Sequence, residues 1–294
     1  MPLSHILAGL LITLLWIGRY VLNKEAGVKK CAPVDLSFSN SAWMALGAIV
    51  ITVMFWNTEF VPFFASGQEM AFPLFMSVIK GFALYSIVRC FAQISGKSLS
   101  SGTFTSNTNF LIGSILIMLI FGDNLNLWDV LSVIAIGAVG ILFLVKGHGR
   151  VLNKSDKIAY FIIILGNTVC MISDRIVAVN YSWAVQLSVS SLTWFGIGVF
   201  SRLIGKSKKH KNSFSILKNK TLLTLGVVYL GGEIFLMYFI QNVFAGVITP
   251  AVFMLAATPA TMLISALKYH EDKWHEQLIF SALIIAPVLT FIIF

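Results

Sequence analysis

One carboxylate of this 294-residue chain, Glu233, lies near the middle of an apolar stretch, residues 221–242, that is long enough to cross a bilayer as a helix. A carboxylate at that depth costs about 2.5–3.5 kcal/mol on a lenient insertion scale, so it should face a cavity or a partner. Tyr229 lies about one turn before Glu233 and Gln241 about two turns after it, which gives the helix one polar stripe. Such a carboxyl can exchange protons or counter a cationic substrate; alternatively, a neighbouring helix satisfies it and its role is structural.

A lysine, Lys80, has the same position in another apolar stretch, residues 72–94. It is too far from either end of the stretch for its ammonium to reach the membrane surface. We expect an ion pair between Lys80 and Glu233, because pairing would offset the desolvation of both charges. The pair would either belong to a substrate site or simply hold the two helices together.

The opposite face of the 72–94 stretch carries a longer polar stripe, in which Tyr85 and Arg89 follow one another at helical spacing together with Ser86 and Gln93. Because both faces cannot point at one cavity, we predict that the longer stripe lines it. Arg89 would then hold an anionic group of a substrate, or else serve as an anchor at the membrane interface.

Three further groups complete the candidate substrate-binding residues. The segment that begins at about residue 99 opens with a run of Ser, Thr and Asn, in which Asn107 and Asn109 either touch a substrate or bond neighbouring helices together. Trp16 forms a wall of the cavity or part of an interfacial aromatic belt, and for the nearby Arg19 we expect the belt. Tyr238 joins the set because it matches Tyr85 in the internal repeat described below.

The elements that must position these residues are membrane helices. The chain is 57% hydrophobic and only 11% charged, whereas a soluble domain carries about a quarter charged residues. No cleavable signal is evident, and the three cysteines have no metal-ligand spacing. Ten hydrophobic segments are predicted, at about 3–22, 36–56, 72–94, 99–121, 127–145, 157–178, 183–204, 221–242, 245–268 and 275–293.

Basic residues alternate between the connecting loops. The first, third, fifth, seventh and ninth connections contain Lys or Arg, whereas the second, fourth and eighth contain neither. Cytoplasmic loops carry an excess of Lys and Arg, so the odd-numbered connections are expected inside and both termini outside. The net charge of +9 therefore reflects membrane topology and does not indicate a nucleic-acid partner.

The two halves of the chain, residues 1–147 and 148–294, repeat one another. LSFSNSAWMALG at 36–47 matches LSVSSLTWFGIG at 187–198, including its Trp and final Gly. These two stretches are 151 positions apart, and a slightly larger offset of 153 positions aligns Lys80 with Glu233 and Tyr85 with Tyr238. Since five helices per half is an odd number, the second half must be inverted in the membrane, and inverted repeats surround the central site of many secondary transporters. The predicted fold is an all-α polytopic membrane protein with ten transmembrane helices in two inverted five-helix repeats.

The repeat resembles that of the drug/metabolite transporter superfamily, in its ten-helix EamA-like branch. That family has a Ser/Thr-Pro midpoint in its fourth repeat helix, matched here by Thr258-Pro259, and a Gly-Glu turn before the fifth, for which Gly122-Asp123 and His270-Glu271 stand in. Trp16-Ile17-Gly18 resembles the Trp-Gly that commonly closes the family's first helix. This sequence departs from the family pattern in two ways. Residues 107–109 replace the proline of the first half. The charge pattern places the termini outside the cell, whereas the family usually has them in the cytoplasm.

We therefore expect a secondary transporter of a small polar or amphiphilic metabolite in the cell's inner or plasma membrane, acting by alternating access and open to proton coupling. Flipping of a lipid-linked group is the alternative within the same class. A membrane enzyme is less favoured, because no HExxH, GxSxG or clustered ligand set occurs, and a channel lacks a repeated selectivity motif. No cofactor, metal or nucleic-acid partner is expected, and the protein should be a monomer or homodimer in the bilayer.

Overall fold

The computed structural model describes residues 2–97, 127–145, 154–204, 219–244, 247–270 and 274–293, with isolated positions between 99 and 122. Within these residues the chain is helical and contains no β-strand. The long helices are α1 (Leu3–Val28), α2 (Pro33–Met54), α4 (Ala71–Lys97), α6 (Leu127–Val145), α7 (Lys154–Asp174), α8 (Trp183–Ile204), α9 (Lys220–Asn242), α10 (Ile248–Tyr269) and α11 (Trp274–Ile293). Short helical turns at Trp56–Phe60, Val61–Ala65 (α3) and Gly67–Met70 join α2 to α4, and a π-helical turn, Arg175–Val179, continues α7.

Seven of the described helices are long and apolar enough to cross a membrane: α1, α2, α4, α7, α8, α9 and α10. About 20 apolar residues in a helix span the hydrocarbon core, so the protein is a multi-pass membrane protein. Nine of the ten predicted hydrophobic segments overlap described helices. The other segment, about 99–121, lies mostly outside the described residues.

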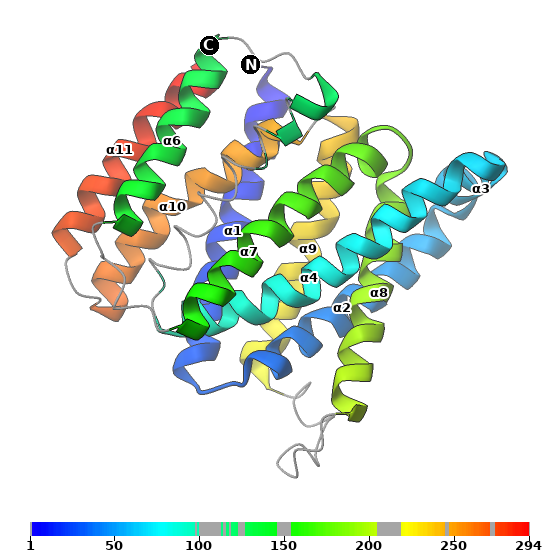
Figure 1. Cartoon of the computed structure of the whole chain (residues 1–294), viewed down its shortest axis with the longest axis horizontal. Helices are drawn as coiled ribbons and strands as arrows, with labels where there is room; N and C mark the ends of the chain where they lie inside the picture. Colours follow the sequence, from blue (N-terminus) through cyan, green and yellow to red (C-terminus); the bar gives the residue numbers. More distant parts are fainter. Residues whose placement is uncertain are drawn as a thin grey trace.

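Helix α1 runs through the centre of the bundle and packs against α4, α9 and α10 (Figure 1). On one side of it, α4 packs on α7 and α8, and α2 packs on α8 and α9. On the other side, α10 packs on α11, which in turn packs on α6. Gly81 permits the close approach of α4 to α8, because a Cβ there would lie 2.7 Å from the backbone oxygen of Ser190.

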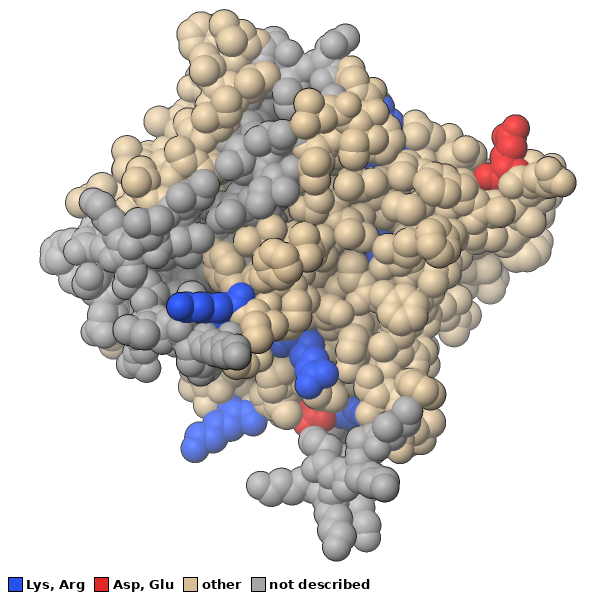
Figure 2. Space-filling view, in the orientation of Figure 1, with Lys and Arg blue, Asp and Glu red and all other residues tan. Residues whose placement is uncertain are grey.

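The two ends of the bundle differ in charge. The α1–α2 turn, the start of α9 and the end of α10 lie at the lower end of the bundle, opposite the start of α1 and the end of α11 (Figure 1). Lys29, Lys30, Lys220 and Lys268 are exposed at that end. Figure 2 shows Lys and Arg side chains in the lower part of the view, beside a small acidic patch, and acidic side chains at the upper right. We refer to the lysine-bearing end as the basic end.

Candidate substrate cavity

A buried ion pair joins α1 to α9. Arg19 Nη1 donates a hydrogen bond of 2.9 Å to Glu233 Oε1, and their side chains are only 11% and 6% exposed. The guanidinium carbon lies 3.5 Å from the ring centroid of Tyr229 and 4.2 Å from that of Trp16. Two aromatic faces therefore hold the cation by cation–π attraction while the carboxylate binds its edge.

A second buried ion pair joins α4 to α7. The ammonium of Lys80 donates to Asp174 Oδ1 at 2.6 Å, and Met237 Sδ lies 3.4 Å from the same nitrogen. The exposed fractions of the Lys80 and Asp174 side chains are 2% and 9%. Because each charge is compensated at short range, the desolvation of both is offset.

Gln186 of α8 orients the carboxylate of this second pair. Its Nε2 donates to Asp174 Oδ1 and to Ser173 Oγ, both at 2.8 Å, while its Oε1 accepts from the Ser77 hydroxyl at 2.5 Å. The opposite amide orientation would place Oε1 against the carboxylate, so the surrounding network selects the orientation that donates to Asp174. Three helices, α4, α7 and α8, thus fix the position of one carboxylate oxygen.

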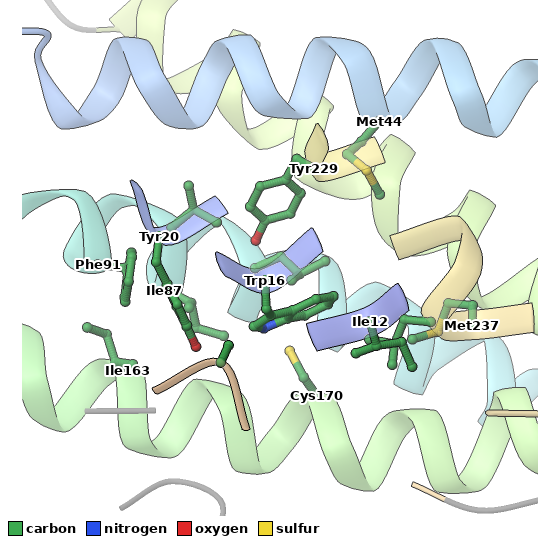
Figure 3. Packing of buried hydrophobic residues seen from close by; sticks show 14 of the residues in the cluster. Ile12, Trp16, Tyr20, Met44, Ile87, Phe91, Ile163, Cys170, Tyr229 and Met237 are labelled. Carbon is green, nitrogen blue, oxygen red and sulfur yellow. The ribbon is translucent and has the colours of Figure 1, made fainter. Parts of the chain in front are cut away.

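Both ion pairs line one cavity of about 160 Å³. Its charged and polar wall consists of Arg19, Asn23, Lys80, Asn167, Asp174, Tyr229 and Glu233. Its apolar and aromatic wall includes Trp16, Tyr20, Leu84, Ile87, Val88, Phe91, Met171, Leu236, Met254 and Leu255. Figure 3 shows Trp16 and Cys170 between a group formed by Tyr20, Ile87 and Phe91 and a group formed by Ile12 and Met237. An apolar cavity with a few convergent polar groups is the usual form of a small-molecule site.

Regular helix geometry brings the lining residues together. Trp16, Arg19, Tyr20 and Asn23 occupy positions i, i+3, i+4 and i+7 of α1, so they share the face of the helix that lines the cavity. The lining of α4 has the same periodicity, at residues 80, 84, 87, 88 and 91. Beyond Arg19 on α1 and Lys80 on α4, the later lining residues of each helix lie progressively closer to the basic end.

Four of the predicted site residues, Trp16, Lys80, Tyr229 and Glu233, lie in this cavity wall. The expected ion pair between Lys80 and Glu233 is wrong, because Asp174 and Arg19 are their respective partners. The expected interfacial position of Arg19 is also wrong. Helix α1 continues to Val28, beyond the predicted end at residue 22, and so Arg19 lies inside the bundle.

The other described candidates lie outside the cavity wall. The Tyr85 hydroxyl donates to Ser201 Oγ of α8 at 2.8 Å, and Arg89 is exposed. Tyr238 is 43% exposed, and its ring packs edge-on against Trp183 at 5.6 Å. The predicted choice between the two faces of α4 is therefore corrected, since the face that carries Lys80 lines the cavity. Asn107 and Asn109 lie outside the described residues.

Sequence reasoning missed Asp174, Asn23, Asn167 and Gln186. One signal for Asp174 was available, because it follows Arg19 by 155 positions, close to the interval of 153 that separates Lys80 from Glu233. No comparable pattern marks Gln186 or the two asparagines. Their positions become evident only when the helices are packed.

A comparison with solved structures places this architecture among known folds. A crystal structure of a protein matches with a TM-score of 0.62 at 12% sequence identity, covering 99% of this chain and 96% of the other. At that identity, the similarity shows a shared fold alone. No family model matches the sequence, and no curated protein matches it.

Proposed function

We propose that the protein is a secondary transporter of the EamA-like branch of the drug/metabolite transporter superfamily, moving a small polar or amphiphilic metabolite by alternating access. The observation that carries the proposal is the cavity inside the bundle, whose wall contains two ion pairs. Each pair joins a cation from residues 1–147, Arg19 or Lys80, to an anion from residues 148–294, Glu233 or Asp174. A movement of one half of the chain relative to the other would therefore break or re-form these ion pairs.

The packing of the helices supports ten spans in two inverted repeats. If the halves correspond, α1 is equivalent to α7 and α4 to α9, and the α1–α9 contact then has a counterpart in the α4–α7 contact. Contacts between equivalent helices also occur, α2 with α8 and α6 with α11. Such pairs are expected next to a pseudo-two-fold axis in the membrane plane.

The ion pairs supply a chemical basis for coupling. Breaking a buried pair strands a charge at a cost of about 3–5 kcal/mol, so the pairs favour the arrangement in which both are closed. A proton delivered to Glu233 would remove the carboxylate charge, so that opening the pair leaves one unpaired charge, Arg19, in place of two. In this proposal, proton exchange at Glu233 accompanies the movement of the two halves.

The lining indicates the side from which the cavity is entered. Asn23, Phe91 and Asn167 lie between the ion pairs and the basic end of their helices. With the basic end in the cytoplasm, according to the positive-inside rule, the cavity faces the cytoplasm and both termini lie outside. We place the protein in the inner or plasma membrane of the cell.

Uptake into liposomes tests the proposal. Purified protein is screened against a library of small metabolites by thermal shift, since a ligand of the folded state raises Tm, and the compound with the largest shift is labelled for uptake. We expect saturable uptake that protein-free liposomes lack and that Glu233→Gln largely abolishes. Glu69→Gln, an exposed carboxylate between α2 and α4, is the matched control and should retain uptake. Absence of protein-dependent uptake for the compounds that bind would refute transport.

A further inference from the structure

The charges in the cavity wall cancel. Among the residues that the structure describes, the Asp, Glu, Lys and Arg residues of the lining are Arg19, Lys80, Asp174 and Glu233. Residues 98–122, most of which the structure leaves undescribed, contain no Asp, Glu, Lys or Arg. The described cavity wall therefore contains two cationic and two anionic side chains, arranged as closed pairs.

Three of the four charges are also held by a group other than the ionic partner. Arg19 lies between the rings of Trp16 and Tyr229. Lys80 contacts the sulfur of Met237, and Asp174 accepts from Gln186. A charged ligand would have to break one of these assemblies or add an uncompensated charge inside the protein, and both are costly at low dielectric.

The remaining wall suits an uncharged molecule. Its polar groups away from the ion pairs include the amides of Asn23 and Asn167, and most of the rest is aliphatic or aromatic. Asn23 is 4% exposed; its Nδ2 donates to the backbone oxygen of Arg19 at 2.7 Å, whereas its Oδ1 has no hydrogen-bond partner in the described part of the chain. A buried acceptor without a partner favours a ligand that brings a donor.

The space inside the cavity is about that of one ring. Its volume of about 160 Å³ is close to the ~150 Å³ of an engineered apolar cavity that admits benzene. A six-membered ring with one small polar substituent fits this space and the mixed wall.

We propose that the cavity selects ring-sized molecules with no net charge and an uncharged hydrogen-bond donor, such as a primary amide, and rejects ions of the same shape. The closed ion pairs are the selectivity element, because they leave neither charge available to a ligand. This inference rests on the proposed function only in taking the cavity as the substrate site.

Three isosteric probes test the charge selectivity: benzamide, benzoate and benzamidinium, measured by isothermal titration calorimetry on the purified full-length protein at pH 7. We expect benzamide to bind at least tenfold more tightly than either ion. Glu233→Gln leaves Arg19 unpaired and should shift the preference to benzoate, whereas Arg19→Met leaves Glu233 unpaired and should shift it to benzamidinium. The double variant restores neutrality and should again prefer benzamide, as should the control Glu69→Gln.

The wild-type comparison requires no variant, and Asp174→Asn provides a second route to a net positive cavity if Glu233→Gln does not fold. Binding of either ion as tightly as benzamide, or no binding of any of the three probes, would overturn the inference. Variants that fold and keep the wild-type order would overturn it as well. Because calorimetry measures binding alone, selective binding without uptake in liposomes would refute the transport proposal while leaving this inference intact.

Discussion

Lys80 and Glu233 line the same cavity without pairing to each other, because Lys80 binds Asp174 and Glu233 binds Arg19. Lys80 and Glu233 are 153 positions apart in the sequence, and Arg19 and Asp174 are 155 apart. In the proposed repeat, each ion pair is therefore the counterpart of the other with its charges exchanged. Both cations come from the first half and both anions from the second, so the ion pairs connect the halves.

The Arg19–Glu233 pair should show strong coupling in a double-mutant cycle. Arg19→Met alone strands a buried carboxylate and should lower the free energy of unfolding by about 3–5 kcal/mol. The Arg19→Met/Glu233→Gln double variant should recover a large part of that loss. Denaturation in detergent measures both values.

The Lys268–Glu25 pair is the matched control for this cycle. Its atoms lie 2.5 Å apart, but the Lys268 and Glu25 side chains are 54% and 31% exposed. Solvent-exposed pairs contribute about 0–1 kcal/mol, so its cycle should show little coupling. Equal coupling energies for the two pairs would contradict the burial argument.

A second cycle identifies the partner of Lys80. Lys80→Met should lower the melting temperature, and adding Asp174→Asn should restore it more than adding Glu233→Gln does. The reason is geometric: the Lys80 ammonium lies 2.6 Å from Asp174, and Glu233 already has Arg19. A better rescue by Glu233→Gln would restore the pairing expected from the sequence.

Hydrophobic segmentation predicted the membrane class and nine of the described helices, since long apolar runs follow from the thickness of a bilayer. The wrong choice of face on α4 has a physical explanation. Periodicity shows which residues share a face, but not which neighbour that face meets. Tyr85 and Gln93 bond to Ser201 and Asp156 instead, as polar side chains between membrane helices often do.

Asp174 escaped prediction because it lies near the end of its hydrophobic segment, directly before Arg175. Charged residues in that position are usually interfacial. In the structure, the π-helical turn Arg175–Val179 continues α7 past this point, and Asp174 stays buried against Gln186 and Lys80. Both features depend on contacts between helices that are distant in sequence.

Single-cysteine variants test the membrane orientation. A cysteine replacing Lys29, exposed at the basic end, should be protected from an impermeant thiol reagent in intact cells. A cysteine replacing Glu69, exposed at the other end, should be labelled. Labelling after permeabilisation is the control for accessibility at both positions. The reverse pattern would place the termini in the cytoplasm, where the resembled family usually has them.

The native Cys31, in the turn between α1 and α2, should react slowly with maleimide near neutral pH. Burial raises the pKa of the Cys31 thiol, the nearby Asp35 carboxylate raises it further, and Lys29 opposes the shift. The thiolate is the reactive form, so below the raised pKa the rate should increase about tenfold per pH unit. Alkylation of a variant lacking Cys90 and Cys170 measures it, with a small model thiol as the comparison. A rate at pH 7 equal to that of the model thiol would contradict the shift.

Gln186 is expected to act on the cavity through Asp174. Replacing Gln186 by Leu removes the donor to the Asp174 carboxylate and the acceptor for Ser77, so it should destabilise the protein by about 1–3 kcal/mol. Gln186→Glu should be worse, because it places a second carboxylate beside Asp174 without a second cation.

Gln93→Leu is the matched control for both Gln186 variants. Gln93 also donates to a carboxylate, Asp156, at 2.9 Å, but this bond lies near the end of α4 and the start of α7, and neither residue lines the cavity.

If Gln186 only holds helices together, its Leu variant should lose stability while the folded fraction binds the cavity ligand normally. If it positions Asp174, ligand affinity per folded molecule should also fall, and Asp174→Asn should remove the extra penalty of Gln186→Glu. Calorimetry on detergent-purified variants, corrected for the folded fraction, distinguishes the two roles.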